Sequence, residues 1–269
     1  MFQNINVEYE NEYENENENV KQKNSRLKEI FSLQNILLYI STLGVSMATF
    51  GEGITPFAMA IFAAVCSNKI PALIVYILAV IGSYIGAGKQ GLLSFILTSL
   101  VFILFSLCYR PKYENEVRNE KKKLGKQLVA STLLVQLMGI GFKTFYVYDF
   151  ITSILLTIVT YIFYKIFVNS ITVIVDYKKK SAFTIEEVIG ASLLVAIAVS
   201  YCLDFTILGF SIKNILCILL VLVLGWKNGV LVGATGGITI GVVLGIISKG
   251  EPSLIAAFAL SRTNSRHLK

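Results

Sequence analysis

The sequence predicts an all-α, polytopic integral membrane protein with about ten short transmembrane helices and both termini in the cytoplasm. Of the 269 residues, 55% are hydrophobic and only 15% are charged, and the mean hydropathy is +0.68. Soluble domains usually contain roughly 25% charged residues. A soluble helical domain would also need polar helix faces, and none occurs between Asn35 and Ser261. Four uncharged runs have lengths close to the ~20 residues that a helix needs to cross a bilayer core. These runs are 92–107, 151–164, 188–203 and 230–248.

Ten apolar segments follow from these runs and from the turn signals between them. Glycine, asparagine and lysine residues mark short turns at 51–53, 68–69, 86–90 and 226–228. Segment 56–67 would span only about 18 Å, so it is either a thin crossing or one half of a re-entrant hairpin. The predicted segments are 30–50, 56–67, 70–87, 91–109, 127–142, 150–172, 186–203, 206–224, 229–248 and an abbreviated 252–261.

The segments divide the chain into three regions. Residues 1–29 form an acidic, asparagine-rich cytoplasmic tail, which ends in a basic stop and whose composition predicts disorder. Residues 30–261 form the membrane domain, with cytoplasmic loops at about 110–126 and 173–185. Residues 262–269 form a basic C-terminal tail.

The distribution of lysine and arginine predicts the orientation. With the N-terminus inside and ten crossings, 19 of the 24 basic residues fall in cytoplasmic segments and four fall in outside loops. Short loops with such an excess are typical of the cytoplasmic side of a membrane protein. The same placement at helix ends argues against a nucleic-acid groove, despite the net charge of +7.

The sequence contains no recognisable catalytic or metal-binding constellation. Its one histidine, His267, lies in the charged C-terminal tail, and the three aspartates lie at different helix ends. The four cysteines show no metal-ligand spacing. We therefore expect no enzymatic activity, no cofactor and no bound metal in this chain.

The most specific pattern is a ladder of glycines at intervals of four residues. Small residues four apart on one helix face allow close helix packing in lipid, so we expect these glycines to form a packing face, with a hinge or substrate groove as the alternative. The ladder comprises Gly225, Gly229, Gly233, Gly237, Gly241 and Gly245.

Four ionisable residues in or near the apolar segments could mark a transport path. Glu52 lies in a glycine turn, and Lys165 can extend its ammonium group towards an interface. Glu186 and Glu187 follow Thr184 in a capping-box pattern, with threonine at the N-cap and Glu187 at the third helical position. Each has an ordinary structural explanation, and a small transporter or solute-uptake subunit stays the alternative function.

Several segments resemble the N-terminal membrane region of the stage II sporulation protein E family. Residues 53–64 (GITPFAMAIFAA) are similar to its Gly-x-x-Pro-Phe-Gly-x-Ala-Phe stretch, with Ala58 in place of glycine. Residues 183–190, the ladder 225–245 and residues 251–261 resemble later parts of that region. The resemblance covers roughly residues 30–261 and includes no catalytic residue.

The resemblance implies a function in sporulation. In that family the membrane region holds the protein at the asymmetric division septum of an endospore-forming bacterium. A cytoplasmic linker and a manganese-dependent serine/threonine phosphatase domain follow, and the phosphatase activates the forespore sigma factor. Manganese would belong to that missing domain. We accordingly expect a truncated membrane-anchoring and septum-targeting module whose partners are the lipid bilayer, septum proteins and other copies of itself.

Overall fold

A computed structural model describes residues 33–49, 55–68, 70, 72–108, 117–141, 146–176, 180, 182–202, 206–207 and 210–247. The chain divides into two compact units, Met1–Leu38 and Tyr39–Lys269. Of the first unit, only the beginning of helix α2 (Leu33–Met47) is described. The predicted tails 1–29 and 262–269 and the segment 252–261 lie outside the described residues.

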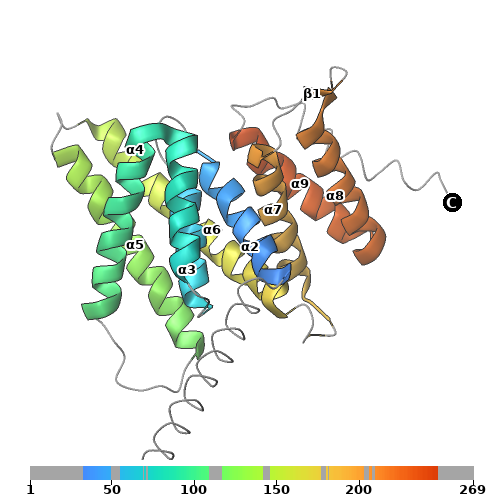
Figure 1. The fold of residues 1–269 in the computed structure, drawn as a ribbon, viewed down its shortest axis with the longest axis horizontal. Helices are drawn as coiled ribbons and strands as arrows, with labels where there is room; N and C mark the ends of the chain where they lie inside the picture. The colour runs from blue at the N-terminus through green and yellow to red at the C-terminus, as the bar shows by residue number, and fades with distance from the viewer. Residues whose placement is uncertain are drawn as a thin grey trace, which may run out of the picture. The chain divides into compact units, whose positions relative to one another are not determined.

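The second unit is almost entirely helical, as the sequence predicts. After the end of α2 it contains α3 (Pro56–Ser67), α4 (Ala72–Cys108), α5 (Val117–Gly141), α6 (Val147–Asp176) and α7 (Ile185–Cys202). A two-residue antiparallel pair, β1 (Thr206–Ile207) with β2 (Phe210–Ser211), precedes α8 (Ile212–Asn228) and α9 (Val230–Ile247). The helices form one group of α3 to α6 and another of α7 to α9, and the packing of α6 on α7 joins them (Figure 1).

Helix α4 folds back on itself at Gly88 (Figure 1). The φ of +62° and ψ of −151° at Gly88 lie in a region that only glycine occupies readily. The hydroxyls of Tyr76 and Ser99 are 3.3 Å apart, which a continuous helix would not allow for residues 23 positions apart. The two arms, 72–87 and 89–108, match the two separate segments that the sequence predicts.

Helix α3 is the centre of the first group. It packs against α4, α5 and α6, and eleven of its twelve residues are buried. Pro56 begins the helix, where a missing N–H costs no hydrogen bond. The Phe62 ring meets the rings of Tyr76, Phe95 and Phe102 edge-on at centroid distances of 5.3, 6.2 and 6.3 Å. This short segment is therefore enclosed by protein along its length.

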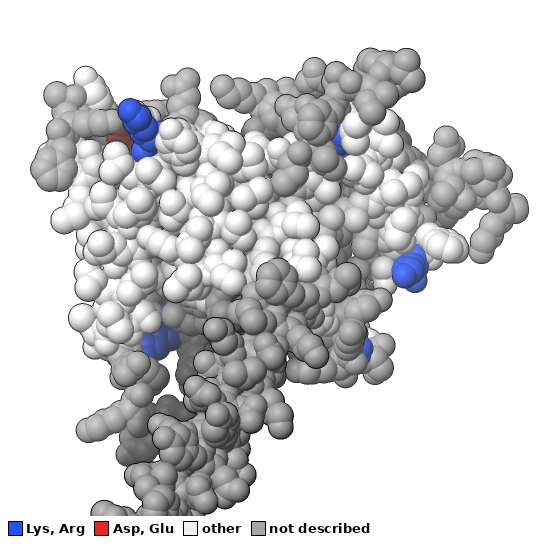
Figure 2. All heavy atoms as spheres, in the orientation of Figure 1, with Lys and Arg blue, Asp and Glu red and all other residues white. Residues whose placement is uncertain are grey.

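The surface of the described residues is strongly apolar. Figure 2 shows a broad uncharged face, with the few lysines and arginines towards its edges. Large apolar side chains are widely exposed, including Leu73, Tyr148 and Leu231, each more than 70% exposed. Contiguous apolar surface of this kind marks contact with lipid or partner proteins. The membrane character predicted from composition agrees with this surface.

Three described helices are long and apolar enough to cross a membrane: Ala72–Cys108, Lys121–Gly141 and Val147–Val175. The first of them comprises two arms because of the fold-back at Gly88. The arms are about 24 and 30 Å long at 1.5 Å per residue. Pro56–Ser67 and Val230–Gly245 are shorter apolar helices.

Three predicted boundaries are wrong. The loop expected at 110–126 is shorter, because α5 begins at Val117, and the loop expected at 173–185 is shorter, because α6 runs to Asp176. Lysine, arginine and glutamate are good helix formers, so a helix can continue into its charged flank. The segment expected to begin at 206 becomes helical only at Ile212, because β1 and β2 occupy the residues before it.

Candidate functional site

The glycine ladder is divided between two helices. Gly225 lies near the end of α8, and Gly229 separates α8 from α9 with a φ of +91°. The expectation that all six glycines share one helix face is therefore wrong. Spacing alone does not reveal the positive φ at Gly229, which favours glycine and allows the chain to turn.

The remaining glycines of the ladder lie on α9, which packs against α7 and α8. Gly233, Gly237, Gly241 and Gly245 are buried, as is Gly225, whereas Gly229 is exposed. The packing role of the ladder stays a prediction, and it now concerns the four glycines of α9 together with Gly225.

Close helix contacts are made by three other glycines, which the sequence reasoning missed. A Cβ added to Gly44 on α2 would lie 2.6 Å from the Ala198 carbonyl oxygen on α7. A Cβ added to Gly82 on the first arm of α4 would lie 2.6 Å from the Ser46 Cβ, and one added to Gly86 would collide with the Met47 backbone. The end of α2 is thus held between α4 and α7 by contacts that only glycine permits.

The signal for one of these contacts is present in the sequence. Gly82 and Gly86 are four residues apart, which is the spacing of the glycine ladder. Gly86 also belongs to the turn signal at 86–90, so it can equally be interpreted as a loop residue. The partner of Gly44 lies 154 residues away at Ala198, and no local pattern indicates it.

The ionisable residues take ordinary structural roles where the structure describes them. Lys165 is exposed, with its Nζ 5.1 Å from the centroid of the Tyr161 ring. Glu186 is exposed in the first turn of α7. Glu52 lies outside the described residues.

The capping box at the start of α7 is confirmed. The Thr184 backbone N–H donates to Glu187 Oε2 at 3.0 Å, and the Glu187 N–H donates to Thr184 Oγ1 at 3.3 Å. Lys180 Nζ lies 3.0 Å from Glu187 Oε1. The Thr184 N–H and the lysine together lower the pKa of the Glu187 carboxyl. This carboxylate precedes the uncharged run 188–203, so it stabilises a helix start at the edge of the apolar region.

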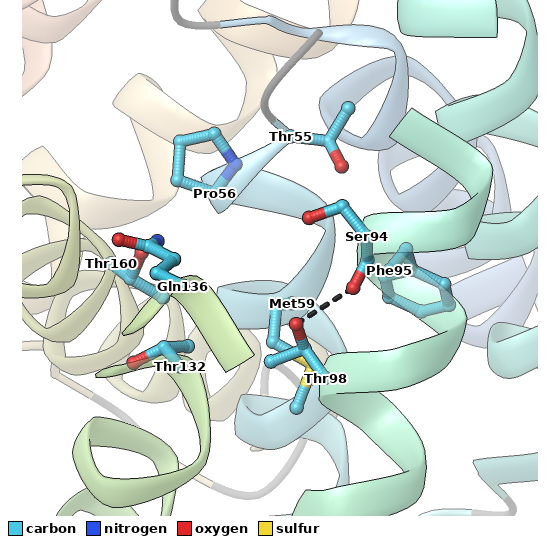
Figure 3. Close-up of a pocket in the computed structure, with 9 residues that line it drawn as sticks. All are labelled: Thr55, Pro56, Met59, Ser94, Phe95, Thr98, Thr132, Gln136 and Thr160. Atoms are coloured by element: carbon cyan, nitrogen blue, oxygen red, sulfur yellow. Dashed lines mark hydrogen bonds between the residues drawn. The ribbon is translucent and has the colours of Figure 1, made fainter. Parts of the chain in front are cut away.

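A small polar cavity lies at the N-terminus of α3 (Figure 3). Its volume is about 20 Å³, which accommodates roughly one water molecule. Pro56, Met59 and Phe95 supply apolar walls. The polar lining residues come from the N-cap of α3 and from α4, α5 and α6, and they are Thr55, Ser94, Thr98, Thr132, Gln136 and Thr160.

Three threonines in the lining of the cavity act as hydrogen-bond acceptors. The hydroxyls of Thr98, Thr132 and Thr160 each donate to a carbonyl four residues earlier, at 2.7 to 2.8 Å. Their single protons are thereby used, and their oxygens can still accept. Gln136 Oε1 is buried and has no hydrogen-bond partner among the described residues. No acid or base is among the described residues that line the cavity, so its chemistry is that of a neutral polar site about the size of one water molecule.

The described residues contain no group of three or more His, Cys, Asp or Glu side chains that could hold a metal ion. Cys66, Cys108 and Cys217 carry free thiols. His267 lies outside the described residues. The absence of enzymatic activity, cofactor and metal stays a prediction from the sequence.

Comparison with known proteins identifies the family. The sequence model described as "SpoIIE, N-terminal domain" matches residues 1–261. The chain is 23% identical over 211 residues to stage II sporulation protein E of Bacillus subtilis (strain 168), and the alignment covers 77% of this chain. The chain spans about a quarter of the length of that curated relative, 25%. No solved structure matches the chain. With nearly its whole length matched by one family model, the chain belongs to the family of SpoIIE N-terminal domains.

Proposed function

We propose that this chain is the membrane-anchoring and septum-targeting module of a sporulation serine/threonine phosphatase. Membership of the SpoIIE N-terminal family is the observation that carries the proposal. The apolar surface and the long apolar helices support anchoring in a membrane. The phosphatase reaction, its manganese and the activation of the forespore sigma factor would belong to a catalytic domain outside this chain.

We further propose ten crossings with both termini in the cytoplasm. The arrangement of α3, α4 and α5 supports this orientation. Lys121 Nζ donates to Asn68 Oδ1 at 3.3 Å, so the start of α5 and the end of α3 lie at the same level. Lys89 lies at the fold-back of α4, one full arm away. The positions expected inside and outside the cell therefore lie at opposite ends of these helices.

The module would act through contacts within the membrane. Close helix approach at glycine and other small residues is the main source of association in lipid, where burial of apolar surface adds little. The exposed apolar face offers a surface for self-association or for septal membrane proteins. Self-association and binding to septal membrane proteins are part of this proposal.

A fluorescent fusion tests the targeting proposal directly. The chain is fused at its N-terminus and expressed in an endospore-forming bacterium whose own stage II sporulation protein E lacks its membrane region. We expect fluorescence at the asymmetric septum soon after sporulation begins. Uniform fluorescence around the whole cell membrane, at the same expression level, would refute targeting and leave only anchoring.

The transporter alternative makes a different prediction. It requires saturable binding of a small solute by the purified chain, with loss of binding on substitution of Glu52 or Glu186. The polar cavity at α3, at about 20 Å³, is too small for an organic solute and lacks an ionisable side chain. Nothing in this cavity favours the transporter over the anchor.

A further inference from the structure

A second, larger pocket opens between the end of α4 and the beginning of α5. Its volume is about 640 Å³, within the ~300–1,000 Å³ usual for small-molecule sites. Lys122, Lys123 and Lys126 belong to its lining, and no acidic side chain is among the lining residues that the structure describes. Lys122 and Lys126 are exposed, and Lys123 is half-buried. The described lining residues therefore carry a net charge of +3.

The rest of the lining is largely apolar. Phe105 and Cys108 come from the last turn of α4, and Ala130 lies one turn beyond Lys126 on α5. The Gln127 side-chain N–H donates to the Phe105 carbonyl oxygen at 3.2 Å, which joins the two helices at the pocket. The three lysines thus form a charged rim beside an apolar lining between two helices.

The position of this pocket along α4 and α5 indicates the depth at which it lies in the membrane. The apolar arm 89–108 ends here, and the apolar span Lys121–Gly141 begins here. The charged rim therefore lies where the hydrocarbon core gives way to the headgroups. Ligands at this level in a membrane protein are amphipathic, and basic pockets between helices on the cytoplasmic side suit anionic lipid headgroups.

We propose that this pocket binds an anionic phospholipid of the cytoplasmic leaflet. Lys122 and Lys126, one helical turn apart, contact the headgroup phosphate, and Phe105, Cys108 and Ala130 receive the upper part of an acyl chain. The proposal depends on membrane embedding and is independent of septum targeting. A purely structural role of the lysines, as partners for the terminal carbonyls of α4, predicts no lipid preference.

Native mass spectrometry of the purified full chain in neutral detergent tests the proposal. The protein is titrated with phosphatidylglycerol and, in parallel, with zwitterionic phosphatidylethanolamine. We expect one phosphatidylglycerol molecule to bind at least ten-fold more tightly than phosphatidylethanolamine. Each lysine near a membrane surface contributes about a five-fold preference for anionic lipid, so Lys122→Gln with Lys126→Gln should reduce binding about 25-fold.

Matched variants separate the pocket from general charge. Lys89→Gln with Lys227→Gln removes two exposed lysines that do not line the pocket, and it should leave the preference unchanged. Ala130→Phe keeps all lysines but fills the apolar part of the pocket, and it should weaken phosphatidylglycerol binding as well. Lys122→Arg with Lys126→Arg should retain binding.

Three results would overturn the proposal. The first is equal affinity of the wild-type protein for the two lipids. The second is an equal loss of affinity in the control variant Lys89→Gln with Lys227→Gln. The third is displacement of the bound lipid by inorganic phosphate or glycerol phosphate at millimolar concentration, which would identify a site for free phosphate. Septal localisation of the fusion protein is measured separately, so failure of either proposal can be recognised without the other.

Discussion

The contact between α2 and α7 at Gly44 gives the sharpest test of the packing account. We consider Gly44→Ala, which adds one methyl group at a helix crossing. That Cβ would lie 2.6 Å from the Ala198 oxygen, 2.7 Å from its Cα and 3.0 Å from its carbonyl carbon. All three atoms belong to the backbone of α7, so no side-chain rotation can relieve the collision.

The expected destabilisation follows from these distances. Ordinary contact begins at 3.4 Å, so the 2.6 Å separation must grow by about 0.8 Å. Displacing one packed helix by this amount separates many other contacts along the crossing. Overpacking of this kind typically costs about 1–3 kcal/mol. At roughly 2–4 °C per kcal/mol for a chain of this size, we expect the Tm to fall by about 2–12 °C.

The assay is thermal unfolding of the detergent-solubilised protein, with Gly139→Ala as the matched control. Gly139 lies two residues before the end of α5, and a Cβ there would meet nothing within 4 Å. Gly44 lies three residues before the end of α2, so the gain in helix propensity is similar in the two variants. We expect the control to unfold at or slightly above the wild-type temperature. A Gly44→Ala variant as stable as Gly139→Ala would refute the close packing of α2 against α7.

The remaining predictions concern the α4 turn, the aromatic core and the α7 cap. Gly88→Ala should cost about 1–3 kcal/mol through backbone strain alone, since a Cβ there would meet nothing within 4 Å, and an unchanged Tm would contradict the fold-back. Phe62→Ala should destabilise by about 2–4 kcal/mol in the same assay, and Phe150→Ala, whose ring is 39% exposed, by much less. Because the Glu187 pKa is lowered in the fold, its contribution is complete above the pKa of the unfolded chain and is lost as pH falls through the folded value. The drop in Tm between pH 6 and pH 3 should therefore be smaller in Glu187→Gln than in wild type, and equal drops would count against the Thr184 hydrogen bond and the Lys180 ion pair of this carboxylate.

The sequence predicts the fold best where the residues that form the signal are close together in the sequence. The sequence places helix α3 at residues 56–67, as the structure does, because Pro56 and Asn68 mark both ends. The sequence also predicts two separate segments for the two arms of α4, because the glycines around Gly88 indicate a turn. The capping box at Thr184 and Glu187 is equally local, and it is confirmed.

Predictions fail where the structure depends on context beyond the local pattern. The beginning of α5 was expected in a loop because charged residues suggest exposure to water, but exposure does not prevent a helix. The four-residue spacing of the glycine ladder continues through Gly229, although the backbone at Gly229 is not helical. The pairing of Gly44 with Ala198 depends on tertiary packing alone.

The polar cavity and the basic pocket show the same limit. The lining residues come from four helices in the cavity and from two consecutive helices in the pocket, and each residue alone has an ordinary role. A threonine that donates to its own helix and a lysine at a helix end are both common in membrane proteins. Only the packing of α3 against α4, α5 and α6 places the threonines around one volume.

The most direct test of the central claim is the membrane orientation of two lysine positions. In a variant without native cysteines, Lys89→Cys and Lys122→Cys are made separately and treated in intact cells with a membrane-impermeant maleimide. Both positions are exposed, at the fold-back of α4 and near the beginning of α5. The account predicts labelling of the cysteine at position 89 in intact cells and of the one at position 122 only after lysis. Labelling of position 122 from outside, or recovery of the protein in the soluble fraction without detergent, would contradict it.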